Sequence, residues 1–327
     1  MNPSSRPCPV CRSQDLTEYR EIDGARRLLK CTDCGLVFLD PVPGDLSVFY
    51  EGYRREGGKR FLYGAETLVK YFRVRRARMI DRLFGPRRKT DGAVKKNDGN
   101  PRVLDIGCGR GLMLAELKSR GFECYGTELP GQTPFRQKTG DAPFTVYEGD
   151  LMELDLPGGF FDVVTIWHVL EHVRDPVQTL KEVRRILKPG GLLVISVPNI
   201  GSLQAKLFGR RWIHLDLPRH LYHFSPGPLA HALKQSGFAV EGFRHFSAEH
   251  GVSGMILSFG ALMSGSGPDL FSTLRGEGKR YGAIVSAMAF APAAFFLSVI
   301  EAVLRMGGVI TVVAEKPLES GPGPEKK

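Results

Sequence analysis

The segment Val103-Leu-Asp-Ile-Gly107-Cys-Gly109-Arg-Gly111 decides the fold of this chain. It joins a short apolar run to three closely spaced glycines, and an amphipathic stretch follows at 112–120. Glycine permits the backbone conformations that a tight turn between a strand and a helix requires. The N-terminus of the helix then presents unpaired backbone N–H groups to a ligand. The segment therefore predicts a strand, a glycine turn and a helix around a bound ligand, a pattern that dinucleotide-binding folds share.

Alternating strand and helix patterns continue from this segment toward the C-terminus. A helix is expected at 177–187, before Lys188-Pro-Gly-Gly191. The alternation predicts an α/β fold with a mostly parallel sheet. Hydrophobic residues make up 42% of the chain and charged residues 24%, which excludes whole-chain disorder. We expect seven strands, at 102–106, 123–128, 143–147, 161–166, 192–197, 238–246 and 308–314.

Acidic residues lie at the positions where a nucleoside ligand needs them. Asp105 lies inside the first strand, and Glu128 ends the second strand 23 residues later. A carboxylate there can accept hydrogen bonds from both ribose hydroxyls. Asp150 follows the third strand and precedes Leu154-Asp-Leu-Pro157. Together these features sharpen the glycine pattern into a prediction of a ribose-containing ligand.

These motifs, over about residues 100–250, resemble the class I S-adenosylmethionine-dependent methyltransferases. The run Ile166-Trp-His-Val-Leu-Glu171-His172-Val and the later Leu187-Lys-Pro-Gly-Gly191 resemble the subgroup of ubiquinone-pathway O-methyltransferases. The resemblance implies a Rossmann-like, mostly parallel seven-stranded sheet with S-adenosyl-L-methionine as cofactor. It also implies the cofactor-binding residues, which are Asp105, Gly107, Cys108, Gly109, Gly111, Glu128, Asp150, Leu151, Trp167 and His168.

Histidines follow the fourth and fifth strands. Methyl transfer to a hydroxyl benefits from a general base whose pKa lies near the operating pH, which favours histidine. The candidates are His168, His172, His220 and His223, and the sequence leaves the choice among them open. Tyr222 and Arg219 are candidates for orienting the substrate.

Four of the six cysteines form two matched pairs near the N-terminus, Cys8-Pro-Val-Cys11 and Cys31-Thr-Asp-Cys34. Two Cys-x2-Cys pairs with 19 residues between them are typical of a zinc ribbon. Four thiolates leave no open coordination position, so such a Zn²⁺ is structural. Iron in a four-thiolate site would have the same sequence pattern.

The net charge of +10 is concentrated in one segment. Residues 54–96 hold 15 Lys/Arg and four Asp/Glu, with apolar residues at helical spacing between 63 and 84 and a polar, flexible linker after Gly85. One interpretation is a solvated basic helix packed on the next domain. The other is contact with an anionic partner, either a membrane surface or, less favoured, RNA.

An insertion at 251–306 separates the last two expected strands. Residues 251–268 and 281–300 carry no charge, and Pro292 interrupts the second stretch. Twenty uncharged residues could span a bilayer as a helix. We weigh a membrane-contacting hairpin that admits a lipid-linked substrate against a soluble lid, a dimer interface and spanning helices.

The sequence thus predicts five parts and one main function. The expected function is O-methylation of a small-molecule, lipid-linked or saccharide acceptor; an RNA methyltransferase and a sugar C-methyltransferase are the alternatives. Nucleic acid is disfavoured because Val197-Pro198-Asn199 lacks the Asn/Asp-Pro-Pro-aromatic signature of base N-methylation.

Without an apolar N-terminal segment, we expect a cytoplasmic protein, at the inner face of the membrane if the insertion contacts lipid. A homodimer is also considered. The parts are a zinc ribbon (1–45), a basic helix and linker (46–99), the methyltransferase core (100–250), the apolar helical insertion (251–306), and the last strand with a polar tail (307–327).

Overall fold

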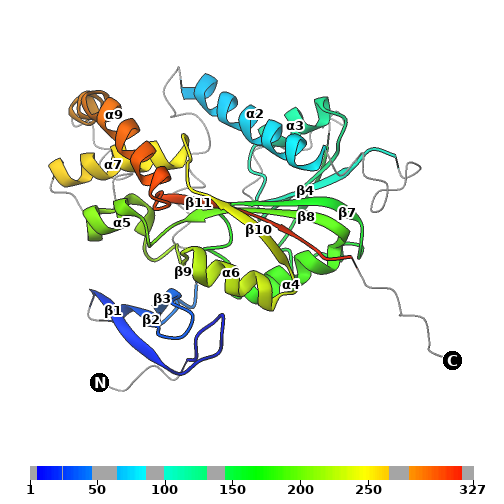
Figure 1. Ribbon diagram of the computed structural model, residues 1–327, viewed down its shortest axis with the longest axis horizontal. Coiled ribbons are helices and arrows are strands. Elements are labelled where there is room, and N and C mark those ends of the chain that lie inside the picture. Colours follow the sequence, from blue (N-terminus) through cyan, green and yellow to red (C-terminus); the bar gives the residue numbers. More distant parts are fainter. Residues whose placement is uncertain are drawn as a thin grey trace.

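The computed structural model describes residues 6–23, 25–45, 65–85, 99–130, 144–264 and 280–318 (Figure 1). Much of the basic segment, at 54–64 and 86–96, lies outside the described residues, as does the middle of the insertion at 265–279.

The central sheet has seven strands in the order β10-β11-β8-β7-β4-β5-β6. All neighbouring strands from β6 to β8 are parallel, whereas β11 runs antiparallel to both β8 and β10. The expected mostly parallel seven-stranded sheet is therefore confirmed. The strands are β4 (Arg102–Ile106), β5 (Glu123–Glu128), β6 (Thr145–Glu148), β7 (Phe161–Trp167), β8 (Leu187–Pro198), β10 (Ala239–Arg244) and β11 (Val309–Glu315).

The order of the strands determines where a ligand can bind. β4 pairs with β5 on one side and with β7 on the other, so the chain changes direction across the sheet at β4. In open parallel sheets, ligands bind outside the carboxyl ends of the strands at such a switch point. Val103, Leu104, Val163 and Val164 are fully buried, as expected for central strands that are covered on both faces.

Strand β8 begins five residues earlier than the sequence predicted. Phe161 pairs with Leu187, but Val163 already pairs with Leu192, so the residues between them form a bulge. The Lys188 ammonium group holds this bulge, because it lies 2.9 Å from a carboxylate oxygen of the buried Asp162.

Helices cover both faces of the sheet. Figure 1 shows α2 and α3 on one face and α4 and α6 on the other. The Asp175 carboxylate accepts hydrogen bonds from two backbone N–H groups and thereby caps α4. The helices are α2 (Ala65–Phe84), α3 (Leu112–Ser119), α4 (Pro176–Ile186), α5 (Leu203–Phe208) and α6 (Pro226–Gln235), with short 3-10 helices η1 (Gly209–Arg211) and η2 (Ile213–Leu215).

A second sheet joins the N-terminal unit to the core. It is antiparallel, with the order β1-β2-β3-β9, and its first three strands are β1 (Leu16–Asp23), β2 (Arg26–Cys31) and β3 (Val37–Asp40). The fourth strand, β9 (Tyr222–His223), comes from the segment that carries two of the candidate histidines. The cysteine unit and the core therefore share a sheet.

The insertion forms two helices that pack on each other, α7 (His250–Ser264) and α9 (Arg280–Val303). The rings of Phe259 and Phe290 are stacked with centroids 5.2 Å apart. Gln204 of α5 donates hydrogen bonds to both carboxylate oxygens of the buried Glu301, each at 2.8 Å, which fixes α9 to the core. Within the described part of the chain, no helix combines the length and the apolar character that crossing a bilayer requires.

Candidate functional site

The glycine turn after β4 is shaped by its surroundings. Gly107, Gly109 and Gly111 all have positive φ angles, of 72°, 52° and 62°. A Cβ atom at Gly107 would lie 2.5 Å from a methyl group of Val169, and one at Gly111 would lie 2.2 Å from the ring of Phe144. A Cβ atom at Gly109 would meet nothing within 4 Å. Packing therefore excludes side chains on either side of Gly109, whose backbone borders open space.

Two of the three predicted acidic residues, Asp105 and Glu128, lie at this turn. Glu128 accepts a hydrogen bond from the Gly109 N–H at 2.8 Å, and Asp105 accepts one from the Thr165 hydroxyl at 2.6 Å. Burial raises the pKa of Asp105 to about 6, although Thr165 and two arginines of α2 act in the opposite direction. Asp150 follows β6, where its carboxylate accepts a hydrogen bond from the Met152 N–H.

The smaller predicted cofactor residues lie in the same region. Leu151 is buried, and the Cys108 sulfur lies so close to Gly126 that a Cβ atom there would be 2.5 Å from it. The Cys108 side chain therefore packs against Gly126, where only glycine leaves room for it. Cys108 follows β4 and Leu151 follows β6, while Glu128 ends β5 between them, so the adenosine-binding set that the resemblance implies lies at the carboxyl ends of three consecutive strands of the sheet.

Two arginines of α2 reach the same edge, which the sequence did not predict. The guanidinium carbon of Arg76 lies 4.4 Å from the ring centre of Trp167, the last residue of β7. Arg76 and Arg73 also form salt bridges with Glu249, at 2.6 and 3.0 Å. These contacts hold α2 and the start of the insertion together beside Trp167.

His168 follows Trp167 in a left-handed backbone conformation, with φ of 54°. Its Nδ1 atom lies 3.4 Å from a carboxylate oxygen of Glu171. Its Nε2 atom is buried and has no hydrogen-bond partner among the described residues. The ring centroid of His250, at the start of α7, is 4.1 Å away, and that of His214 is 6.3 Å away. The insertion therefore contributes a histidine directly against the predicted base.

The other predicted histidines lie around Glu171. His172 donates from Nδ1 to the Arg219 carbonyl, and His220 donates from Nδ1 to the His214 carbonyl. One donor atom each from Glu171, His172 and His220 lies within 4.8 Å of the others. Burial acts to raise the pKa of Glu171, but the contact with His168 and the charges that His168, His172 and His220 carry when protonated lower it to about 2. This ionised carboxylate can stabilise a protonated imidazole, and the same three side chains have the donor types of a divalent-cation site.

The histidines differ in how well they could accept a proton. Burial lowers the pKa of His172 to about 4 and that of His223 to about 3, so both are weak bases. Burial and His168 lower the pKa of His214 to about 4 as well. In His220, Nδ1 donates to a carbonyl and Nε2 lies 3.6 Å from Asp216, whereas the buried Nε2 of His168 has no partner among the described residues, which makes it the best-placed candidate base by geometry.

Two residues predicted to orient the substrate are engaged elsewhere. The Tyr222 hydroxyl donates to the Arg174 carbonyl at 2.6 Å and accepts a hydrogen bond from Arg6 of the N-terminal unit. Arg219 forms a salt bridge with Asp216 at 2.7 Å.

Sequence reasoning missed His250 because it is distant in the chain from the motifs. Its position just before an uncharged stretch was the only signal in the sequence that could have indicated it.

The four N-terminal cysteines come together as predicted. The Cys8 and Cys34 sulfurs are 3.6 Å apart, and the Cys11 and Cys31 sulfurs are 3.4 Å apart, with no disulfide between them. Four sulfurs at the usual Zn–S distance from one ion would be roughly 3.8 Å apart, so the cluster fits a tetrahedral metal. The neighbouring Cys34 thiol lowers the pKa of Cys8, which favours the thiolate that a metal needs.

Comparison with known proteins agrees with this geometry. The family model "Methyltransferase domain" matches residues 71–242. The Ubiquinone biosynthesis O-methyltransferase of Cereibacter sphaeroides is 34% identical over 146 residues, which cover 42% of this chain and 59% of that protein. The protein of the same name from Pseudomonas aeruginosa is 32% identical over 154 residues, covering 43% of this chain and 65% of that protein. A solved SAM-dependent methyltransferase from Archaeoglobus fulgidus has a TM-score of 0.45 and 22% identity, covering 83% of this chain and 100% of that chain.

The strand order, the antiparallel β11 and the glycine turn define a Rossmann-like domain of the S-adenosylmethionine-dependent methyltransferase class. Because the family model matches more than half of its residues, the chain belongs to the methyltransferase domain family. The match to the curated relatives spans about three fifths of their length.

Proposed function

We propose that this protein transfers the methyl group of S-adenosyl-L-methionine to a hydroxyl oxygen of a small-molecule acceptor. One observation carries the proposal. His168 is half-buried at the carboxyl end of β7 beside the glycine turn, with its Nε2 atom buried and unpartnered and the buried Glu171 next to its Nδ1. This arrangement suits removal of a proton from an acceptor hydroxyl.

The chain's own residues divide the work as follows. Glu128 and the Gly109 backbone hold the ribose, and Asp105 with the remainder of the glycine turn surrounds the methionine portion. When bound, the cofactor supplies a methyl group on a sulfonium, which a nucleophile can attack in line. Transfer of the methyl group to oxygen would leave the electrons of the broken carbon–sulfur bond on the sulfur of S-adenosylhomocysteine. His168 Nε2 would accept the proton that the hydroxyl loses, and Glu171 would stabilise the resulting imidazolium. Orienting the two reactants contributes most of the acceleration.

The acceptor class is proposed from the relatives and from one surface of the insertion. The curated relatives bear names that place them in ubiquinone biosynthesis, which favours a lipid-linked hydroxyl compound here. On α9, Phe295, Phe296 and Val303 are exposed, with 53%, 66% and 77% of their surface accessible. Phe296 and Val303 are seven residues apart and therefore share one face of the helix, and exposed apolar side chains grouped in this way are typical of an interaction site.

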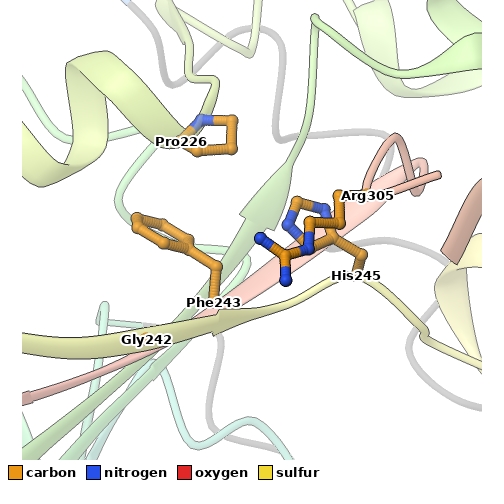
Figure 2. Close-up of a pocket in the computed structure, with 5 residues that line it drawn as sticks. All are labelled: Pro226, Gly242, Phe243, His245 and Arg305. Carbon is orange, nitrogen blue, oxygen red and sulfur yellow. The ribbon is translucent and has the colours of Figure 1, made fainter. Parts of the chain in front are cut away.

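A pocket that contains Arg305, two residues after the end of α9, is shown in Figure 2. It has a volume of about 530 Å³ and contains none of the predicted site residues. Figure 2 shows Arg305 and His245 side by side, with Pro226, Gly242 and Phe243 also lining the pocket. Exposed apolar side chains and an arginine that follows them in the chain fit an anionic membrane surface, and we propose that α9 contacts one while the chain acts on a lipid-linked acceptor.

The four-cysteine cluster is proposed to hold a structural Zn²⁺. The sulfur–sulfur distances support this assignment, and Cys8, Cys11, Cys31 and Cys34 would fill all four positions.

The test of the proposed function uses methyl-labelled S-adenosylmethionine. The purified protein is incubated with a short-chain hydroxylated benzoquinol, with a membrane lipid extract or with total RNA. Label in the quinol or in the lipid extract, as a base-stable methyl ether, is the expected result. Label in RNA alone, or on nitrogen or carbon, would overturn O-methylation of a small molecule.

A further inference from the structure

The strand β9 connects the cysteine unit to the candidate active site. Val37 and Phe38 of β3 pair with His223 and Tyr222 of β9. The Leu39 N–H donates to the Leu221 carbonyl at 2.9 Å, which extends this pairing by one residue. The edge of the N-terminal sheet is therefore completed by residues 221–223, which follow His220 directly.

The same three-residue stretch also contacts Glu171. The N–H groups of Leu221 and Tyr222 both donate to the Glu171 carbonyl, at 2.9 and 3.2 Å. Glu171 in turn lies beside His168 and belongs to the donor cluster with His220. The backbone at 221–222 is thus hydrogen-bonded to the cysteine unit through Leu221 and to the loop after β7 through both N–H groups.

The cysteine ligands are close in sequence to the pairing residues. Cys34 precedes Val37 by three residues, and the turn between them is closed by hydrogen bonds from the Gly35 N–H to the Cys31 carbonyl and from the Cys31 N–H to the Leu36 carbonyl. A metal held by Cys31 and Cys34 would therefore fix the turn from which β3 starts. Without it, four buried or half-buried thiols would have to hold the turn alone.

Side chains reinforce the same junction. Arg6 donates to the Tyr222 hydroxyl, Arg210 donates to the Glu21 carbonyl at 2.9 Å, and Arg174 donates to the Gly44 carbonyl at 2.7 Å. None of these contacts involves Glu128 or Asp105, which lie at β5 and β4. The junction is therefore connected to the part of the site that contains Glu171 and His220. It is not connected through these contacts to the part that contains Glu128 and Asp105.

We infer that the four-cysteine centre is a positioning element for the proton-transfer side of the active site: by fixing β3 it holds β9, and through β9 it holds Glu171 and His220. Loss of the metal releases this side while cofactor binding persists. The inference rests on the proposed function only where the methylation rate is measured. The positioning itself is measured by hydrogen exchange of backbone N–H groups.

The experiment compares full-length Cys31→Ser with Cys124→Ser, which removes a buried thiol outside the cluster. Zinc content, calorimetric affinity for S-adenosylmethionine, hydrogen exchange and initial rate are measured for each. In Cys31→Ser we expect zinc to be lost and the affinity for S-adenosylmethionine to stay within about twofold of wild type. Hydrogen exchange at Leu221 and Tyr222 should become faster by about tenfold or more, whereas exchange in β4 and β10 should not change. The methylation rate should fall by about tenfold or more, since the geometry for proton transfer is lost. Cys124→Ser should keep wild-type zinc, β9 exchange and rate.

Two results would overturn the inference. One is unchanged exchange at β9 despite zinc loss. The other is a parallel loss of protection in every strand together with loss of cofactor binding, which would show a general role in stability. Tyr222→Phe is a milder variant that keeps the cysteines and removes only the hydroxyl contacts with Arg6 and Arg174. It should make hydrogen exchange at β9 faster while zinc is retained. Unchanged exchange in this variant would also count against the inference. If wild type transfers no methyl group, the proposed function fails, but the exchange comparison still tests the positioning.

Discussion

Glu128 illustrates how much one residue at the end of a strand can determine. Its carboxylate already accepts the Gly109 N–H, so it is oriented toward the turn where a ribose would lie. Replacing Glu128 with alanine removes both this orientation and the acceptors for the ribose hydroxyls. We expect the dissociation constant for S-adenosylmethionine to rise by roughly 10- to 100-fold, the value of one or two hydrogen bonds to a charged group.

Calorimetric titration measures this effect, and Glu123→Ala is the matched control. Glu123 begins the same strand but pairs with Arg102 at 3.1 Å, away from the turn. An unchanged affinity in Glu128→Ala, or an equal loss in both variants, would contradict the ribose assignment.

His168 is the second residue whose role can be isolated. Asparagine at this position keeps a polar side chain but removes the proton acceptor, so the turnover number should fall by roughly 10²- to 10⁴-fold. The affinity for S-adenosylmethionine should change by no more than a few-fold. His231→Asn, at an exposed position on α6, should behave as wild type. Turnover within a few-fold of wild type in His168→Asn would exclude His168 as the base.

At the scale of elements, α9 presents the surface that bears on the membrane proposal. Phe296 and Val303 are exposed, whereas Glu301 on the same helix is buried against Gln204. Serine at both exposed positions should therefore leave the fold intact while removing apolar area from a membrane-facing surface. We expect flotation with vesicles that contain phosphatidylglycerol to fall several-fold.

Leu318→Ser is the control, because Leu318 is also exposed but follows β11 rather than lying on α9. Full flotation of the Phe296/Val303 double variant, or no flotation of wild type, would refute the contact through α9. Unchanged flotation that disappears in high salt would instead point to the basic segment at 54–96.

The elements show where sequence reasoning succeeded and where it stopped. The strands were predictable because buried parallel strands such as 161–166 are rich in apolar and β-branched residues. The glycine turn was predictable because it requires positive φ angles. The contact of His250 with His168, and of Arg76 with Trp167, depends on how separate elements pack. No local pattern encodes such contacts, and the early start of β8 likewise depends on the Lys188–Asp162 pair.

At the scale of the whole molecule, the burial of several histidines at one junction couples stability to pH. Burial lowers the pKa of His172 and His214 to about 4 and that of His223 to about 3. In the unfolded chain these groups titrate near 6.5. The folded state therefore stays unprotonated at pH values where the unfolded state takes up protons. The stabilisation is fully present above pH 6.5 and is lost as the pH falls toward 4.

Asp105 acts with the opposite sign. Its raised pKa of about 6 means that the folded state takes up a proton before the unfolded chain does, which stabilises the fold as the pH falls below 6. Burial also lowers the pKa of His250. Four histidines against one carboxyl leave a net loss of roughly 3 kcal/mol in the free energy of unfolding between pH 6.5 and 5.5. Urea unfolding at the two pH values measures it. His223→Gln should reduce the loss, because one buried histidine no longer titrates in the unfolded state. A pH-independent unfolding free energy, or the same pH dependence in His223→Gln as in wild type, would show that these histidines are not held neutral in the folded protein.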